Sequence, residues 1–499
     1  MKRSIFFSLM LLASAFAFAQ TPDAEYKVLK QSYTLNSDGT LDYHYRKEMV
    51  LHRNRAMTAY ADKGETFILY NPDFQTLNIN ESYTLRADGT KVETPRNAFI
   101  DQLPSQAVNC GRFNRLRELA IVHTALEYEC TIVLDYTIHS TNVTLLTDKI
   151  QITQDCPINH YELEIDLPYG QTLYYSVLNQ DKGSLNVSST QNNLFISADQ
   201  VPQTYGEAYL PDPLEIYPTV AFSNVLDFTR YIMNLVSPGG DYSSVESTPE
   251  ALRDYVVDNI NTNPLPMSLL NYDLVDVSTI WYSNCATPEE KAYLLADMLR
   301  HYNYSDADAI IGSQPFTTED GTTFMVPLPS RSRVQFTING IAHTLFANDK
   351  RPLRITDSAI DEVSTISDSK TFNWKPQATN SKYHTITLPE TSDKGCKMNP
   401  ALLTSSRKAP VKATPVNERY TYQYNLPKGY KMLTNPVNIT MKEPGLGTLV
   451  IDIKQEGQTV KVVKHLMILP SIINADQYPT FRKMLSEWNS HNQITVKGK

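Results

Sequence analysis

The chain has few glycines and few charged residues for its length. Glycine accounts for 18 of 499 residues, and 20% of the residues are charged. These shortages exclude collagen-like, coiled-coil and disordered compositions. Tyrosine is frequent instead, with 30 residues, and the composition indicates a globular, β-rich protein. At roughly 150 residues per domain, the length suggests about three domains, each long enough to bury its own core.

An excess of positive charge is also absent. The formal net charge is −9, so the chain has no general basic surface for nucleic acid or anionic lipid. The sequence contains no Gly-x-x-x-x-Gly-Lys-Ser/Thr loop for phosphate and no dinucleotide-binding Gly-x-Gly-x-x-Gly. The ten histidines are scattered without the spacing of metal ligands. We therefore expect no cofactor, no metal and no nucleic-acid partner.

Long apolar runs are missing except at the N-terminus. Lys2 and Arg3 precede an apolar run over 5–18, and small residues at Ala17 and Ala19 suit a signal peptidase. We expect residues 1–19 to be a signal peptide, cleaved after Ala19, and the mature protein to be periplasmic, extracellular or at the cell surface. No later run approaches the 18 or more apolar residues that a transmembrane helix needs, so we expect no transmembrane segment.

Cysteine is scarce, and its odd number leaves at least one thiol unpaired or paired between chains. The five residues are Cys110, Cys130, Cys156, Cys285 and Cys396. Their pairing cannot be deduced from their spacing. Cys130 lies in an apolar, strand-like run over 128–134, which is typical of a small core residue.

The residues that are present predict three domains of alternating character. Residues 20–215 form an N-terminal β-sandwich, because alternating segments flank Asp-Gly turns at Asp38-Gly39 and Asp88-Gly89. Prolines at 211, 213 and 218 then mark a boundary.

Residues 216–365 combine helices with a hairpin. Helical spacing predicts helices over 226–236 and after Thr248-Pro249. The clearest signal is the capping box Thr287-Pro288-Glu289-Glu290, which opens a helix with an apolar stripe over 295–302. Asn339-Gly340 between two apolar runs predicts a hairpin. The mixture indicates an α+β core.

Residues 366–499 return to β character. Strands are expected over 420–426, 448–453 and 459–468, and a terminal helix over 475–488 should dock on the last sheet. The fold class is therefore an α+β multidomain protein, with β-sandwiches on both sides of an α+β core.

Two segments carry a resemblance to a known family. Asn80–Thr90 is an extended run ending in Asp-Gly-Thr, and Glu290–Arg300 reads Glu-Lys-Ala-Tyr-Leu-Leu-Ala-Asp-Met-Leu-Arg. In this order the chain resembles exported Gram-negative transglutaminase-like proteins, which carry a β-sandwich domain of unknown function ahead of a cysteine-protease-like core and a β domain behind it. The resemblance implies a papain/transglutaminase-like core at residues 216–365.

The resemblance also implies where a catalytic triad would lie. An active member has its cysteine at the start of the core helix, three residues before Lys291, with a histidine and an aspartate in the hairpin that follows. Pro288 occupies the cysteine position here. Cys285, His343 and Asp349 follow the required order along the chain, but each lies out of register with the family pattern.

Our preferred hypothesis is an exported transglutaminase-like pseudoenzyme that binds a peptide, a glycan or another envelope protein. The ligand would occupy a cleft above Pro288 and the hairpin, where helix amides and Arg333 favour an anionic group. The alternative is an active cysteine peptidase or acyl-transferase with Cys285 as nucleophile, His343 as base and Asp349 orienting the base. A third hypothesis is a structural envelope protein without a ligand.

Overall fold

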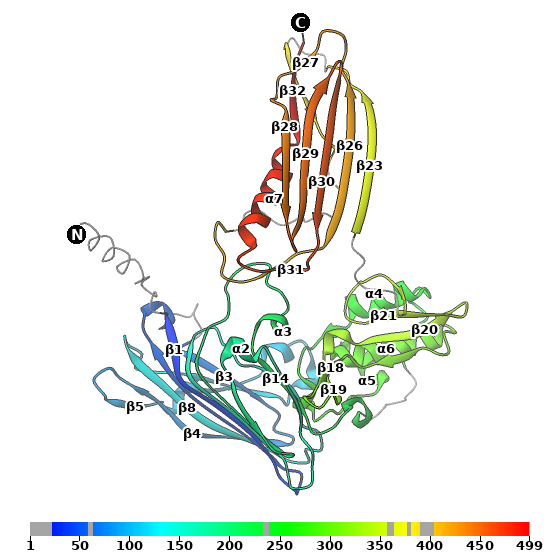
Figure 1. Ribbon diagram of the computed structural model, residues 1–499. Helices are drawn as coiled ribbons and strands as arrows, with labels where there is room; N and C mark the ends of the chain where they lie inside the picture. The colour runs from blue at the N-terminus through cyan, green and yellow to red at the C-terminus, as the bar shows by residue number, and fades with distance from the viewer. Residues whose placement is uncertain are drawn as a thin grey trace, which may run out of the picture. The chain divides into compact units, whose positions relative to one another are not determined.

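The computed structural model describes residues 22–57, 63–232, 239–356, 364–376, 381–389 and 404–498. It is mostly β, and it divides into two compact units (Figure 1). Unit 1 lies within Met1–Thr204 and Tyr217–Ser358, and unit 2 lies within Tyr205–Ile216 and Ala359–Lys499. The predicted signal peptide lies outside the described residues, as does Cys396. None of the described helices is long and apolar enough to cross a bilayer.

The N-terminal part of unit 1 is built on an eight-stranded sheet in the order β12-β13-β10-β1-β2-β8-β4-β5. Its strands are β1 (Ala24–Leu35), β2 (Leu41–Leu51), β4 (Gln75–Leu85), β5 (Lys91–Glu93), β8 (Cys130–Ser140), β10 (Ile158–Asp166), β12 (Asn186–Ser189) and β13 (Asn193–Val201). Both predicted Asp-Gly hairpins form, between β1 and β2 and between β4 and β5. Gly39 and Gly89 have φ of 79° and 86°, a conformation that a side chain would strain.

Two smaller sheets cover one face of this sheet. Their strands are β9 (Thr147–Gln151), β11 (Tyr174–Leu178) and β14 (Thr219–Ser223) in one, and β3 (Glu65–Tyr70), β6 (Phe99–Gln102) and β7 (Arg117–Val122) in the other. Leu163 of β10 shares a buried cluster with Phe222 of β14, and Ile121 of β7 shares another with Leu134 of β8. The packing of sheet on sheet gives this part its sandwich-like character.

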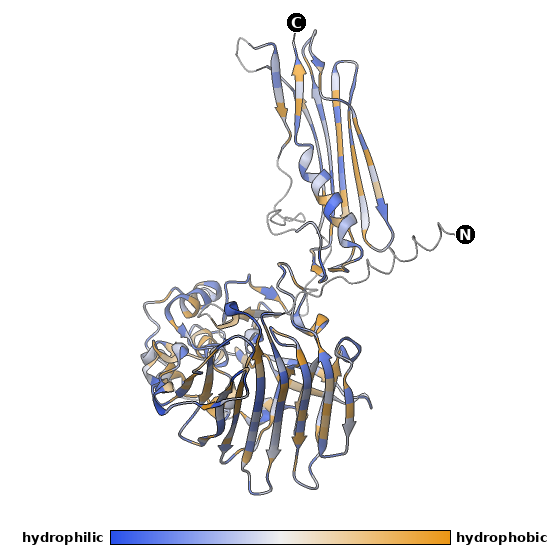
Figure 2. Cartoon of the chain, turned by 90° about the vertical axis from the view of Figure 1, so that its left-hand side faces the viewer, coloured by the Kyte–Doolittle hydropathy of each residue, from blue (hydrophilic) through white to orange (hydrophobic). Residues whose placement is uncertain are grey.

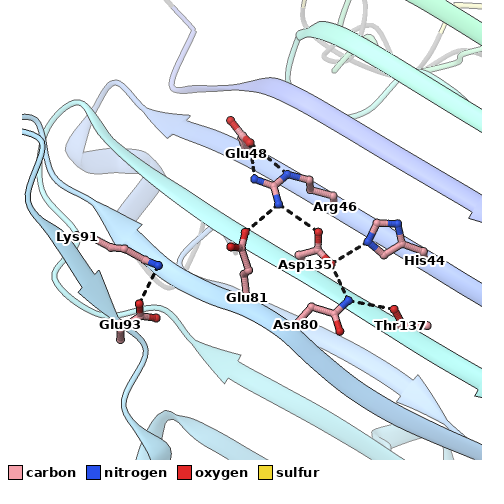
Figure 3. Close-up of polar contacts among 9 residues, drawn as sticks. All are labelled: His44, Arg46, Glu48, Asn80, Glu81, Lys91, Glu93, Asp135 and Thr137. Atoms are coloured by element: carbon pink, nitrogen blue, oxygen red, sulfur yellow. Dashed lines mark hydrogen bonds and ion pairs between the residues drawn. The ribbon is translucent and has the colours of Figure 1, made fainter.

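The opposite face of the eight-stranded sheet carries a polar network, because alternate side chains of a strand point to opposite faces (Figure 3). Asp135 of β8 accepts hydrogen bonds from Arg46 and His44 of β2 and from Asn80 of β4. Burial alone would raise the pKa of Asp135, but these three hydrogen bonds outweigh it and hold that pKa below its ordinary value. Arg46 also pairs with Glu81 at 2.8 Å. The network therefore ties three adjacent strands together.

The central part of unit 1 combines helices with a small sheet in the order β17-β20-β21-β22. Its main elements are α4 (Pro249–Asn259), α5 (Val277–Ser283), α6 (Pro288–His301), β17 (Asp308–Ile310), β20 (Arg333–Ile338), β21 (Ile341–Phe346) and β22 (Arg354–Ile355). Paired short strands accompany them, namely β15 (Asn261–Thr262) with β16 (Cys285–Ala286) and β18 (Ser313–Thr317) with β19 (Thr323–Pro327). The apolar stripe of α6, including Leu295 and Leu299, packs against Val334 of β20.

Local signals located α4 and α6 correctly, whereas α5 was not predicted and the helix predicted over 226–236 did not form in its described residues. Thr248 caps α4, and Thr287 with Glu290 forms the predicted capping box of α6. The helix predicted over 226–236 is wrong in its described residues, which contain only a 3-10 turn at Phe228–Tyr231. The side chain of Asp227 accepts from the Thr229 N–H and so favours a local turn over a helix. Residues 233–238 of that prediction lie outside the described part.

The remaining helical turns of unit 1 are short. They are α2 (Gln180–Gly183) and the 3-10 turns η1 (Asn54–Met57), η2 (Arg96–Ala98), η3 (Ser105–Ala107), η4 (Gly111–Phe113), η5 (Phe228–Tyr231), η6 (Met267–Leu270) and η7 (Pro329–Arg331). Of these, η4 and η6 matter most for the site described below, because residues in them and next to them line its pocket.

Replacement of Thr287 tests the contribution of the capping box. We expect Thr287→Ala to lower the free energy of unfolding by about 1 kcal/mol, since the N–H of Glu290 loses its acceptor. Thr287→Ser keeps the hydroxyl and should retain most of the stability. Urea denaturation of both variants checks this. An equal loss in the two variants would show that the Thr287 methyl, and not the cap, matters at this buried position.

Unit 2 is a five-stranded sheet in the order β23-β26-β30-β29-β28, with α7 (Tyr478–Ser490) lying along it (Figure 1). The sheet contains β23 (Ser364–Asn373), β26 (Val416–Asn425), β28 (Val437–Glu443), β29 (Gly447–Glu456) and β30 (Thr459–Ile468). The smaller elements are β24 (Tyr383–Thr387), β25 (Val411–Lys412), β27 (Lys431–Met432), β31 (Ile472–Ile473), β32 (Gln493–Lys497) and α3 (Pro213–Ile216). Hydrophobic and hydrophilic residues alternate along the strands (Figure 2), and Phe481 and Trp488 of α7 join the core on the buried face.

The segment 205–216 groups with unit 2, whereas residues 205–215 were predicted to belong to the N-terminal domain. The carboxylate of Glu207 accepts from the N–H groups of Lys408 and Ala409 and lies 3.4 Å from the buried Arg407 guanidinium. The carbonyl of Tyr209 accepts from the Lys412 N–H. These long-range bonds explain the difference from the boundary expected after residue 215. The division into three domains at 215 and 365 stays a prediction.

Candidate ligand pocket beside the start of helix α6

The start of α6 is closed by its own side chains. The hydroxyl of Thr287 accepts from the Glu290 N–H at 3.3 Å, and the Glu290 carboxylate accepts from the Thr287 N–H at 2.8 Å. Pro288 is the first helical residue and has no N–H to offer. A carboxylate therefore occupies the positive end of this helix, where the family resemblance expects a thiolate.

Cys285 lies just before the cap, in β16, and forms a disulfide with Cys110. The two Cα atoms are 5.7 Å apart, although 175 residues separate the cysteines along the chain. Cys285 is fully buried, in an apolar cluster with Phe113 and Leu269. A disulfide sulfur has no thiolate form, so Cys285 is not a nucleophile in this state. Cys130 and Cys156 are buried free thiols.

The other two residues of the hypothetical triad have partners of their own. The Nδ1 of His343 lies 2.8 Å from the carbonyl oxygen of Ile341 on the same strand. Asp349 accepts from the Arg351 side chain at 2.7 and 2.8 Å. Burial alone would raise the pKa of Asp349, but the hydrogen bonds from Arg351 outweigh it and lower that pKa. The structure thus gives Cys285, His343 and Asp349 three separate partners.

Pro288 and Arg333, the two residues expected in a ligand cleft, have separate hydrogen-bond partners. Pro288 is buried, and its carbonyl accepts from the Asn348 side chain at 3.1 Å. Arg333 is half-buried at the start of β20, and its Nη1 lies 3.4 Å from the Arg331 carbonyl.

A pocket of about 360 Å³ opens on the Glu290 side of the helix start. Its volume lies within the range of roughly 300–1,000 Å³ that is typical of ligand sites. Its wall includes five charged side chains, from Asp73, Arg112, Arg115, Asp273 and Glu290, but neither Pro288 nor Arg333. These five residues were not predicted as a site, because they come from segments more than 200 residues apart that share no motif.

The back of this pocket is a buried ion pair. Arg112 donates to both oxygens of Glu290, at 3.0 and 2.5 Å, and the Val275 N–H donates to the same carboxylate at 3.1 Å. Glu290 is 1% exposed. A bidentate pair with a third donor satisfies a buried carboxylate well. The pair and the Cys110–Cys285 disulfide together join residues 110–112 to the start of α6.

Glu289 precedes Glu290 in the same helical turn, but it has neither an arginine partner nor a donor from a distant backbone N–H among the described residues. Its side chain is fully buried, and neither carboxylate oxygen has a hydrogen-bond partner among the described residues. Burial is the largest cause and raises the pKa of Glu289 to about 7. The local backbone N–H and the Thr287 hydroxyl lie near the carboxylate and lower its pKa, and the carboxylate of Glu290 raises it slightly. The two residues cannot be distinguished from sequence, because both stand in the first turn of the same helix.

Comparisons with known proteins match both ends of the chain. Residues 37–203 match DUF3857, and residues 384–496 match DUF3858, each described as a domain of unknown function with solved structure. Both matches lie outside residues 204–383. No curated protein matches the chain.

A solved structure matches nearly the whole chain. It is a protein from Parabacteroides distasonis described as a "putative protease", with a TM-score of 0.69 and 23% sequence identity. The alignment covers 95% of this chain and 99% of that one. The match indicates that the two proteins share a multidomain fold. At this identity the likeness concerns the fold alone.

Proposed function

We propose that the protein is an exported, non-catalytic transglutaminase-like protein that binds a peptide in the pocket beside the start of α6. The observation that supports this most is the occupation of the helix start by Pro288 and the Glu290 carboxylate, with the nearest cysteine held in a disulfide. Without a thiolate at this place, the helix start lacks the nucleophile that such chemistry needs, whereas the pocket beside it is open to a ligand.

The pocket supports binding because it combines polar and apolar walls. Phe74, Leu116 and Val275 line it together with the charged residues. Ligand sites commonly have this mixture, in which apolar walls supply contact area and a few polar groups fix orientation. Export with cleavage after Ala19 belongs to the same proposal. N-terminal sequencing of the protein recovered from expressing cells tests it, and an intact Met1 would contradict it.

A comparison of two cysteine variants tests the absence of catalysis. Cys285→Ala and Cys110→Ala remove the same disulfide, but only the second leaves a thiol at position 285. We expect neither variant nor the wild type, with or without reductant, to turn over peptide or amine-acceptor substrates.

The alternative, catalysis by Cys285, His343 and Asp349, requires the disulfide to open. It predicts activity in reduced wild type and in Cys110→Ala, and none in Cys285→Ala. That pattern, with rapid alkylation of Cys285 in Cys110→Ala near pH 6, would contradict the proposal.

A further inference from the structure

The charges that line the pocket beside α6 do not balance. Arg112 is held by Glu290, and Arg115 lies 3.1 Å from Asp73. Asp273 is the fifth charged residue of the lining, and its exposed carboxylate has no hydrogen-bond or ionic partner in the described part of the chain. Each guanidinium thus has one carboxylate, and one carboxylate is left over. The pocket therefore has a net negative charge and an exposed acceptor.

The aromatic lining of the pocket also suits a cation. The Arg112 guanidinium lies over the Phe113 ring at 4.3 Å, so one ring of the lining already makes a cation–π contact. Phe74 is a second ring in the same lining, and Leu270 and Val275 add aliphatic surface. Lysine and arginine have an apolar stem and a charged end, which match aliphatic walls and a carboxylate respectively.

From this juxtaposition we infer that the pocket binds a basic side chain, lysine or arginine, of a peptide ligand, with Asp273 as its counter-ion. The inference rests on the proposed function, because it names the chemistry of the ligand at the same site. The stem of the basic residue lies against Phe74 and Leu270, and its charged end reaches the Asp273 carboxylate. Arg112 and Arg115 keep their own carboxylates, so the incoming cation displaces no existing pair.

Calorimetric titration of the full-length mature protein tests this. The probes are five blocked pentapeptides, acetylated and amidated at their ends, that differ only in a central Lys, Arg, Met, Gln or Glu. We expect the Lys and Arg peptides to bind about tenfold more tightly than the Gln peptide, and the preference to weaken with added salt. Asp273→Asn should remove the preference, and Asp273→Lys should shift it to the Glu peptide.

Glu319→Gln is the matched control, since Glu319 is an exposed carboxylate that lines a different pocket of unit 1. It should leave the preference for basic peptides unchanged. Equal binding of all five peptides, or an unchanged preference in Asp273→Asn, would overturn the inference and leave peptide binding intact. Failure of every peptide to bind would overturn the proposed function itself, and the inference with it.

Discussion

Loss of the Cys110–Cys285 disulfide is expected to destabilise unit 1 by about 4 kcal/mol. The bond closes a loop of 175 residues, and a cross-link across so long a loop removes much conformational freedom from the unfolded chain. Both cysteines are buried, so their removal also leaves small cavities in the cluster around Phe113 and Leu269. The Cys110→Ala/Cys285→Ala variant and the reduced wild type should therefore both unfold at lower urea concentrations.

Hydrogen exchange of peptide segments across a urea series measures this effect in each unit separately. Segments of unit 1, such as residues 288–301, should lose protection early, whereas segments of unit 2 provide an internal reference within the same molecule. Reductant should lower the stability of unit 1 in the wild type but not in the double variant. Cys156→Ala, which removes a buried free thiol, controls for the loss of a sulfur atom alone. Equal stability of the oxidised wild type and the double variant would contradict the expectation.

The sequence predicted those parts of the fold that depend on neighbouring residues. The Asp-Gly and Asn-Gly hairpins and the capping box of α6 form as predicted, because each depends on the backbone preferences of a few adjacent residues. The terminal helix was likewise located by the helical spacing of Phe481, Met484 and Trp488.

The candidate pocket could not be predicted in the same way. It joins Asp73, Arg112, Asp273 and Glu290, which become neighbours only when the sheets and helices pack. The disulfide illustrates the same limit, since five cysteines allow many pairings and nothing local favours Cys110 with Cys285. Where family resemblance did suggest a site, at Pro288 and Arg333, it could not show on which side of the helix start a pocket would open.

Glu289→Gln is expected to stabilise unit 1 at neutral pH. In the unfolded chain the carboxyl has its ordinary pKa of 4.5, and in the folded state that pKa is about 7. Between these values the folded state holds a proton that the unfolded state has lost, so the contribution of Glu289 to stability falls as the pH rises through this window. A shift of this size corresponds to about 3 kcal/mol.

The variant should therefore differ from the wild type in the shape of its pH profile. Below about pH 4.5 both side chains are neutral, and the variant should be less stable than the wild type only by the cost of burying the glutamine amide without partners. The stability of Glu289→Gln relative to the wild type should rise between about pH 4.5 and 7 and then level off. The cost of burying the glutamine amide without partners reduces this gain.

Glu290→Gln provides the matched control, because the same substitution one residue further along removes a paired carboxylate. It leaves Arg112 without its buried counter-ion and weakens the capping box, so it should destabilise unit 1 by about 3 kcal/mol at pH 7. The two substitutions would then change the free energy of unfolding in opposite directions, although the two glutamates are adjacent and equally buried. That result would show that hydrogen-bond partners, and not burial or distance from the helix end, determine the stability of this helix start. A loss of stability in both variants would mean that the Glu289 carboxylate has a partner in the folded protein.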